Sequence, residues 1–182
     1  MEPEVHIIDK YFQEVKRCFT MTNIQLKGKK EIDLLAISPT INQYYHIESR
    51  ISTTFKLRLK ATYTKDGRCH KNGLDYFQKE KFEHPTVRKK IRELIGDIDY
   101  HKVLVVWDTQ DNFAEMPTIA EQQYGIEIMG LRGMIHEFTH KNITSGSRDD
   151  ILRVLELVSH IQKEEKAFLT RVNKLGERQR GS

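Results

Sequence analysis

The sequence predicts an α/β protein, a sandwich in which a mixed central sheet is flanked by helices. Three observations support this class. Apolar residues recur at helical spacing over residues 4–19, which predicts an opening helix. Two strand-like segments, 31–37 and 44–51, follow each other across a Pro-containing turn, which predicts an antiparallel pair. Later, the apolar segments 102–107 and 125–129 are separated by a short helical pattern, which predicts a parallel crossover.

The first half of the chain supplies a helix and the antiparallel strands. Pro3 suits the start of the opening helix, and Val5, Ile8 and Phe12 lie on its apolar face. Residues 22–26 form a short strand, which precedes a basic turn and the two strands already described.

The second half supplies the covering helices. A helix is expected over 86–95, since His84-Pro85 precedes its apolar face and Gly96 follows it. Further helices are expected at residues 117–123, 131–140 and 148–172.

Composition is typical of one globular domain. The chain has 182 residues, 31% of them charged, with a net charge of +4. No apolar segment approaches the ~20 residues of a membrane span, and the acidic start lacks the apolar core of a secretory signal. Cys18 and Cys69 form no CxxC pair, which favours a reducing cytoplasm. We expect one domain over residues 1–175, a disordered tail at 176–182, and no membrane association; a homodimer is plausible.

Two carboxylates stand inside the apolar strands. Asp33 follows Ile32, and Glu48 follows Ile47. Side chains alternate between the faces of a strand, so in a hairpin Asp33 and Glu48 can project from one face, with Arg50 beside them. A charge rarely occupies such a position without a partner or a metal ion. The sequence therefore predicts a site for a divalent cation and a phosphate.

This arrangement resembles the PD-(D/E)xK nuclease superfamily, which has the restriction-endonuclease-like fold. Asp33 corresponds to the acid of one core strand, and Glu48-Ser49-Arg50 corresponds to the (D/E)-x-K tripeptide on the next. Glu4, on the first helix, is the candidate for the acid that often precedes them. In element order, the resemblance covers residues 4–130. It implies a nuclease that cleaves DNA with the help of Mg²⁺ or Mn²⁺, which Asp33 and Glu48 hold.

The tripeptide departs from the family at its last position. Arg50 can stabilise charge on a phosphate, but it stays protonated and cannot act as a base. His46, on the same face, is interpreted as a half-buried sheet residue rather than a phosphate ligand. Lysines that could replace the missing one in space are Lys27, Lys29, Lys30, Lys56 and Lys60.

Basic clusters flank the acidic strands in sequence. They are the expected contacts to nucleic-acid phosphates and comprise Lys27, Lys29, Lys30, Lys56, Arg58 and Lys60. A third cluster, residues 88–90, lies on the predicted helix 86–95.

A competing motif occurs near the end of the chain. His136, Glu137 and His140 match HExxH, in which two histidines one helical turn apart bind Zn²⁺ and the glutamate is a general base. Glu156 or His160 could supply the third ligand. The helix is short, however, and a polar loop follows it directly, which argues against a zinc peptidase.

Three hypotheses result. The leading one is a metal-dependent deoxyribonuclease that uses Asp33, Glu48 and Arg50. The second is a catalytically silent binding module on the same fold, favoured if Arg50 bridges Glu48. The third is the zinc peptidase. A lysine within reach of Asp33 and Glu48 favours the first.

Overall fold

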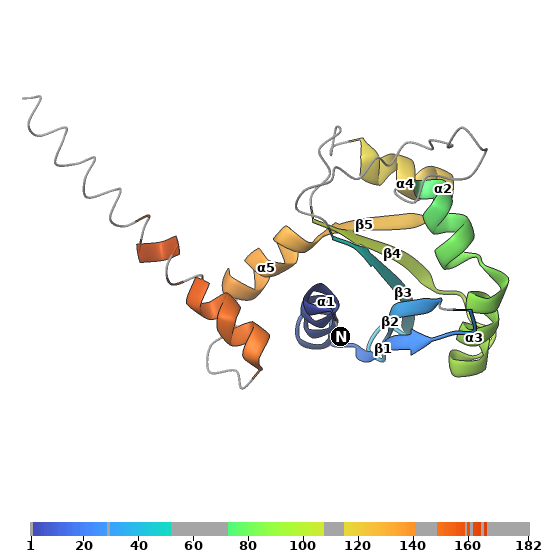
Figure 1. The fold of residues 1–182 in the computed structure, drawn as a ribbon, viewed down its shortest axis with the longest axis horizontal. Coiled ribbons are helices and arrows are strands. Elements are labelled where there is room, and N and C mark those ends of the chain that lie inside the picture. The colour runs from blue at the N-terminus through green and yellow to red at the C-terminus, as the bar shows by residue number, and fades with distance from the viewer. Residues whose placement is uncertain are drawn as a thin grey trace, which may run out of the picture. The chain divides into compact units, whose positions relative to one another are not determined.

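The computed structural model shows a sheet with helices on both faces (Figure 1). The residues that it describes are 2–28, 30–51, 73–107, 115–140, 149–158, 160, 162–164 and 166. The chain divides into two compact units, residues 1–134 and 135–182, and the whole sheet belongs to the first.

Five strands form a single sheet in the order β1-β2-β3-β4-β5. The strands are β1 (Phe19–Gln25), β2 (Glu31–Ser38), β3 (Gln43–Arg50), β4 (His101–Val106) and β5 (Ile126–Gly130). The helices are α1 (Pro3–Glu14), α2 (Leu74–Tyr76), the π-helix η1 (Phe77–Phe82), α3 (Pro85–Ile95), α4 (Met116–Tyr124) and α5 (Leu131–His140). The first three strands are antiparallel, and β3, β4 and β5 are parallel. The predicted α/β class with a mixed sheet is confirmed, and so is the parallel crossover through α4.

The opening helix ends earlier than the sequence predicts. The apolar spacing continues to Val15, but α1 ends at Glu14, and Arg17 has a left-handed φ of 57°. A non-glycine residue in that conformation cannot continue a right-handed helix. The chain therefore turns, and β1 begins at Phe19.

The register of the sheet assigns the polar residues to one face. Leu35 lies opposite His46, and Glu48 lies beside Leu104 on the parallel neighbour. Because directly paired residues point to the same side, Leu35, His46, Glu48 and Leu104 share a face. Tyr45 belongs to the other face, where its ring packs on Phe12 of α1 with 5.5 Å between ring centroids.

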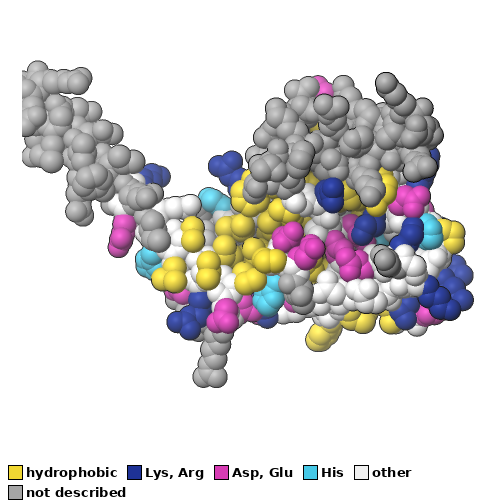
Figure 2. All heavy atoms as spheres, in the orientation of Figure 1, with side chains coloured by type: hydrophobic (Ala, Val, Ile, Leu, Met, Phe, Trp, Pro, Cys, Tyr) yellow, Lys and Arg dark blue, Asp and Glu magenta, His cyan; other side chains and the backbone are white. Residues whose placement is uncertain are grey.

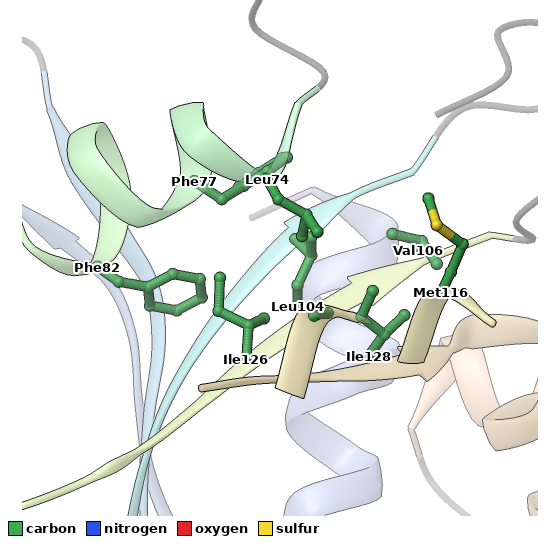
Figure 3. Packing of buried hydrophobic residues seen from close by; sticks show 9 residues of the cluster. Leu74, Phe77, Phe82, Leu104, Val106, Met116, Ile126 and Ile128 are labelled. Carbon is green, nitrogen blue, oxygen red and sulfur yellow. The ribbon is translucent and has the colours of Figure 1, made fainter. Parts of the chain in front are cut away.

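An apolar cluster covers the face that carries Glu48 (Figure 3). It joins α2, η1 and α4 to β4 and β5 and consists of Leu74, Phe77, Phe82, Leu104, Val106, Met116, Ala120, Ile126 and Ile128. Phe77 and Phe82 are both fully buried although they lie five residues apart. The π-helix permits this, since its wider turn brings residues i and i+5 to one side.

Helix α3 packs beside the start of β2. Its residues Val87 and Ile91 form a second buried cluster with Ile32 and Leu35. Pro85 occupies its first turn, His84 Nδ1 accepts a hydrogen bond from the backbone N–H of Thr86 at 3.3 Å, and Gly96 ends it at a φ of 89°. The predicted helix is thus confirmed to within one residue. The opposite surface of α3 is basic.

In the second unit, residues 150–158 are helical, and Val154, Leu157 and Val158 are exposed. The rest of the predicted 148–172 helix and the tail lie largely outside the described residues. None of the described helices combines the length and the apolar character that crossing a membrane requires.

Candidate active site

The two acidic strands place both carboxylates on the face of the sheet that α2, η1 and α4 cover. Leu34 pairs with Ile47, and continuing this antiparallel register by one residue sets Asp33 opposite Glu48. Glu48 is fully buried, and Asp33 is 9% exposed. The sequence prediction that these acids share a face is consistent with this geometry. We refer to Asp33 and Glu48 as the carboxylate pair.

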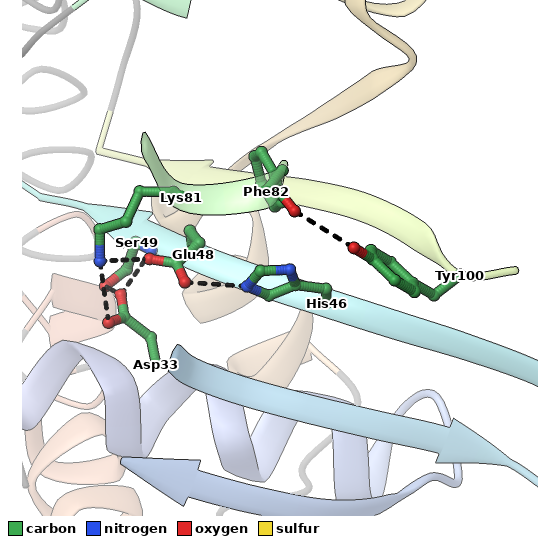
Figure 4. A network of polar contacts seen from close by, with 7 residues as sticks. All are labelled: Asp33, His46, Glu48, Ser49, Lys81, Phe82 and Tyr100. Atoms are coloured by element: carbon green, nitrogen blue, oxygen red, sulfur yellow. Dashed lines mark hydrogen bonds and ion pairs between the residues drawn. The ribbon is translucent and has the colours of Figure 1, made fainter. Parts of the chain in front are cut away.

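Asp33 is held by the residue that follows Glu48. Its Oδ2 accepts hydrogen bonds from the backbone N–H of Ser49 at 2.8 Å and from Ser49 Oγ at 2.7 Å (Figure 4). Burial, and after it the nearby Glu48 carboxylate, raise the pKa of Asp33 to about 6. Lys81 and the two Ser49 hydrogen bonds oppose this rise only in part. Asp33 is therefore ionised at neutral pH but binds a proton more tightly than an exposed aspartate.

Glu48 contacts a buried histidine through one oxygen. His46 Nε2 lies 2.9 Å from Glu48 Oε1, and both side chains are fully inaccessible. The imidazole packs edge-on against Phe82 and Tyr100, with centroid distances of 4.8 and 5.7 Å. Its Nδ1 has no hydrogen-bond partner among the described residues. A carboxylate accepts only, so we assign the ring proton to Nε2. His46 is thus more deeply buried than the sequence predicts, and it bonds directly to Glu48.

Lys81 of η1 completes the network. Its Nζ lies 2.6 Å from Glu48 Oε2 and 3.9 Å from Asp33 Oδ1 (Figure 4). Burial lowers the pKa of the Lys81 ammonium, but Glu48 and Asp33 raise it by more, so the net shift is upward. Lys81 is therefore a cation at neutral pH. The sequence prediction considered five other lysines for this position and missed Lys81.

The donor set suits a hard cation. Carboxylate oxygens are the protein ligands that Mg²⁺ prefers, and Mg²⁺ is commonly bound by one or two carboxylates, with waters and substrate phosphate completing the shell. Asp33 Oδ1 and Glu48 Oε2 are the oxygens not bonded to Ser49 or His46. Within the described ranges, no three His, Cys, Asp or Glu side chains gather closely enough to hold a metal. Glu4, half-buried in the first turn of α1, therefore does not join the carboxylate pair as a third ligand.

The remaining predicted site residues are dispersed. Arg50 is exposed at the end of β3, and Lys27 is exposed in the turn after β1. Lys30 pairs with Glu80 of η1 at 2.9 Å, which ties that turn to the helix carrying Lys81. Lys29, Lys56, Arg58 and Lys60 lie outside the described residues.

A groove lies between the turn after β1 and α3. Its volume is about 510 Å³, and we call it the basic groove. It is lined by Gln25, Leu26, Lys27, Pro85, Thr86, Lys89, Lys90 and Glu93. Lys27 and Lys89 are exposed, and neither takes part in an ion pair with another described residue. Lys and Arg side chains gather over α3 in the space-filling view (Figure 2).

The HExxH motif lies on α5, and the residues that directly follow His140 lie outside the described part of the chain. His136 is exposed, Glu137 is half-buried, and the side chain of His140 lies outside the described part of the chain. Among the described residues, neither Glu156 nor His160 belongs to a group of three or more potential metal ligands. The geometry available thus lends the zinc peptidase no support.

Comparison of the chain with protein-family models, with curated proteins and with solved structures found no match. The feature of the molecule that points to a function is therefore the carboxylate pair with its neighbours His46, Ser49 and Lys81.

Proposed function

We propose that this protein is a metal-dependent nuclease that hydrolyses DNA phosphodiester bonds, with Asp33 and Glu48 as metal ligands. The observation that carries the proposal is Lys81 Nζ, 2.6 Å from Glu48 and 3.9 Å from Asp33. The tripeptide of the resembled family ends in lysine, and here that position is Arg50. Lys81 supplies from a helix the ammonium that the strand lacks.

We further propose that the fold is restriction-endonuclease-like. Support comes from the order of elements: a helix, three antiparallel strands, a helical segment, and a strand parallel to the third. The two acids stand on consecutive strands, β2 and β3, as in the resembled family.

Each side chain has a role in this mechanism. Asp33 and Glu48 would hold a divalent cation, which would lower the pKa of a water nucleophile and polarise the phosphate. Ser49 and His46 hold one oxygen of each carboxylate, and the other oxygen of each faces Lys81 Nζ. Lys81, a cation next to the reacting group, orients the water or phosphate and stabilises charge developing on the phosphate oxygens.

The basic groove supports a nucleic-acid substrate. Lys27, Lys89 and Lys90 line it, and the single acid, Glu93, is paired with Lys90 at 3.7 Å. Lysines at phosphate-contacting positions supply sequence-independent affinity. Lys30, in the turn that borders the groove, pairs with Glu80 of η1, the helix that also carries Lys81.

The test is cleavage of single-stranded, duplex, flap and junction DNA with Mg²⁺ or Mn²⁺. We expect Asp33→Ala to reduce cleavage by at least about 100-fold, since even the outer partners of metal ligands contribute about 10–100-fold. Asp97→Ala, which removes an exposed carboxylate paired with Arg92, is the matched control and retains activity. Cleavage that survives in Asp33→Ala would refute this site, and no cleavage by the wild type would favour a silent binding module.

A further inference from the structure

The free oxygens of the carboxylate pair both face one ammonium group. Ser49 occupies Asp33 Oδ2, and His46 occupies Glu48 Oε1. The other two oxygens, Asp33 Oδ1 and Glu48 Oε2, point to Lys81 Nζ (Figure 4). Lys81 therefore stands where a cation shared by the two carboxylates would bind.

A metal ion and this ammonium compete for the same oxygens. A Mg²⁺ ion bound to a carboxylate oxygen lies about 2.0–2.1 Å from it. Lys81 Nζ is already 2.6 Å from Glu48 Oε2, so an ion bridging both carboxylates would lie next to another positive charge. Two cations that close repel each other strongly in a site from which water is largely excluded.

Lys81 has room to leave. Its side chain is 24% exposed, whereas that of Glu48 is fully buried, so the ammonium can move outward while the carboxylate stays in place. Lysine carries its charge on a flexible four-carbon stem, and a short rotation moves the ammonium while retaining its charge.

We propose that Lys81 is an exchangeable counter-ion: in the metal-free protein it neutralises the carboxylate pair, and a divalent cation must displace it to bind. The inference builds on the proposed function, since the same two carboxylates are the metal ligands. It assigns Lys81 a role in metal occupancy in addition to its role beside the phosphate.

The first experiment measures the affinity of purified protein for Mn²⁺ alone by titration calorimetry. We expect Lys81→Met to bind Mn²⁺ at least about tenfold more tightly than wild type, because no ammonium has to be displaced. Lys79→Met, an exposed lysine on the same helix, removes the same charge outside this network and should leave the affinity unchanged. Equal or weaker binding by Lys81→Met would overturn the inference.

The second experiment uses the wild-type protein, because Lys81→Met leaves two buried carboxylates unpaired and can impair folding without metal. Mn²⁺ should accelerate acetylation of Lys81 by an amine-directed reagent, measured by peptide mass spectrometry, and should leave Lys79 unaffected. A rate for Lys81 that Mn²⁺ leaves unchanged or slows would contradict displacement.

These outcomes separate the inference from the proposed function. Tighter Mn²⁺ binding and faster acetylation without DNA cleavage would uphold the exchange and refute the nuclease. Cleavage that depends on Asp33, with no effect of Lys81→Met on affinity, would uphold the nuclease and refute the exchange. Failure of wild type and variant alike to bind Mn²⁺ would refute both.

Discussion

The raised pKa of Asp33 predicts a specific dependence of stability on pH. Burial and the Glu48 carboxylate raise this pKa from the usual 3.8 to about 6. The folded protein therefore binds the proton more tightly than the unfolded chain does between these values. The contribution of Asp33 to the free energy of unfolding therefore falls as pH rises through this window. At about 1.4 kcal/mol per pH unit, the loss attributable to Asp33 is ~3 kcal/mol.

The perturbation is Asp33→Asn, which removes the titrating group and keeps an oxygen that can accept from Ser49. We expect the stability of the variant relative to wild type to increase by ~3 kcal/mol between pH 3 and pH 8. The assay is urea unfolding at one-unit pH steps with a chelator present, so that adventitious metal does not contribute. Taking the difference between the two proteins cancels the titration of the shared groups that do not interact with Asp33.

The matched control is Asp97→Asn, since the Asp97 side chain is 84% exposed. Its difference from wild type should stay constant with pH to within ~0.5 kcal/mol, as for most surface substitutions. A similarly constant difference for Asp33→Asn would refute the reasoning, because it would mean that Asp33 titrates alike in the folded and unfolded states.

Three further predictions test neighbouring parts of the site. His46→Leu should weaken Mn²⁺ binding about 10–100-fold in calorimetry, and His46→Gln, which keeps an N–H donor, should restore part of it; equal affinities would contradict a positioning role. Replacing Lys27 and Lys89 together by alanine should reduce the slope of log K against log salt for duplex DNA by about 1.8, as measured by fluorescence anisotropy. An unchanged slope would show that the basic groove does not contact the DNA. Phe82→Ala should cost ~3–5 kcal/mol in urea unfolding, and a cost below ~1 kcal/mol would show that the core tolerates the cavity.

The carboxylate pair was predictable because strands have a strict side-chain period. Once two apolar strands in a hairpin each contain one acid, alternation decides which face the acids share. The predicted strands, 31–37 and 44–51, differ from β2 and β3 by at most one residue at each end. The parallel crossover was predictable for a similar reason, since β4 is a continuous apolar segment of the kind that a covered sheet requires.

Lys81 could not be found by the same reasoning. It lies 33 residues beyond Glu48 in the chain, and its helix was not predicted; Phe77 and Phe82 lie five residues apart, a spacing outside the α-helical pattern. One signal was present nonetheless. Lys81 immediately precedes the buried Phe82, and a lysine on the core side of a helix requires a counter-charge. His46 was misjudged because the sequence does not reveal that Phe82 and Tyr100 enclose it.

The position of Lys81 depends on the number of residues in η1, whereas the positions of Asp33 and Glu48 on β2 and β3 do not. Each residue of an α-helix advances the chain by about 100° around the axis. Deleting one residue between Phe77 and Lys81 would convert the π turn to an ordinary α turn. If Phe77 stayed anchored in the core, Phe82 would follow it by four residues on the same side of the α-helix, and the Lys81 ammonium, directly before Phe82, would stay near β3. A one-residue deletion should therefore preserve the contact between Lys81 and the carboxylate pair, whereas a one-residue insertion, which advances Lys81 by about 100° around the helix axis, should break it without altering either strand.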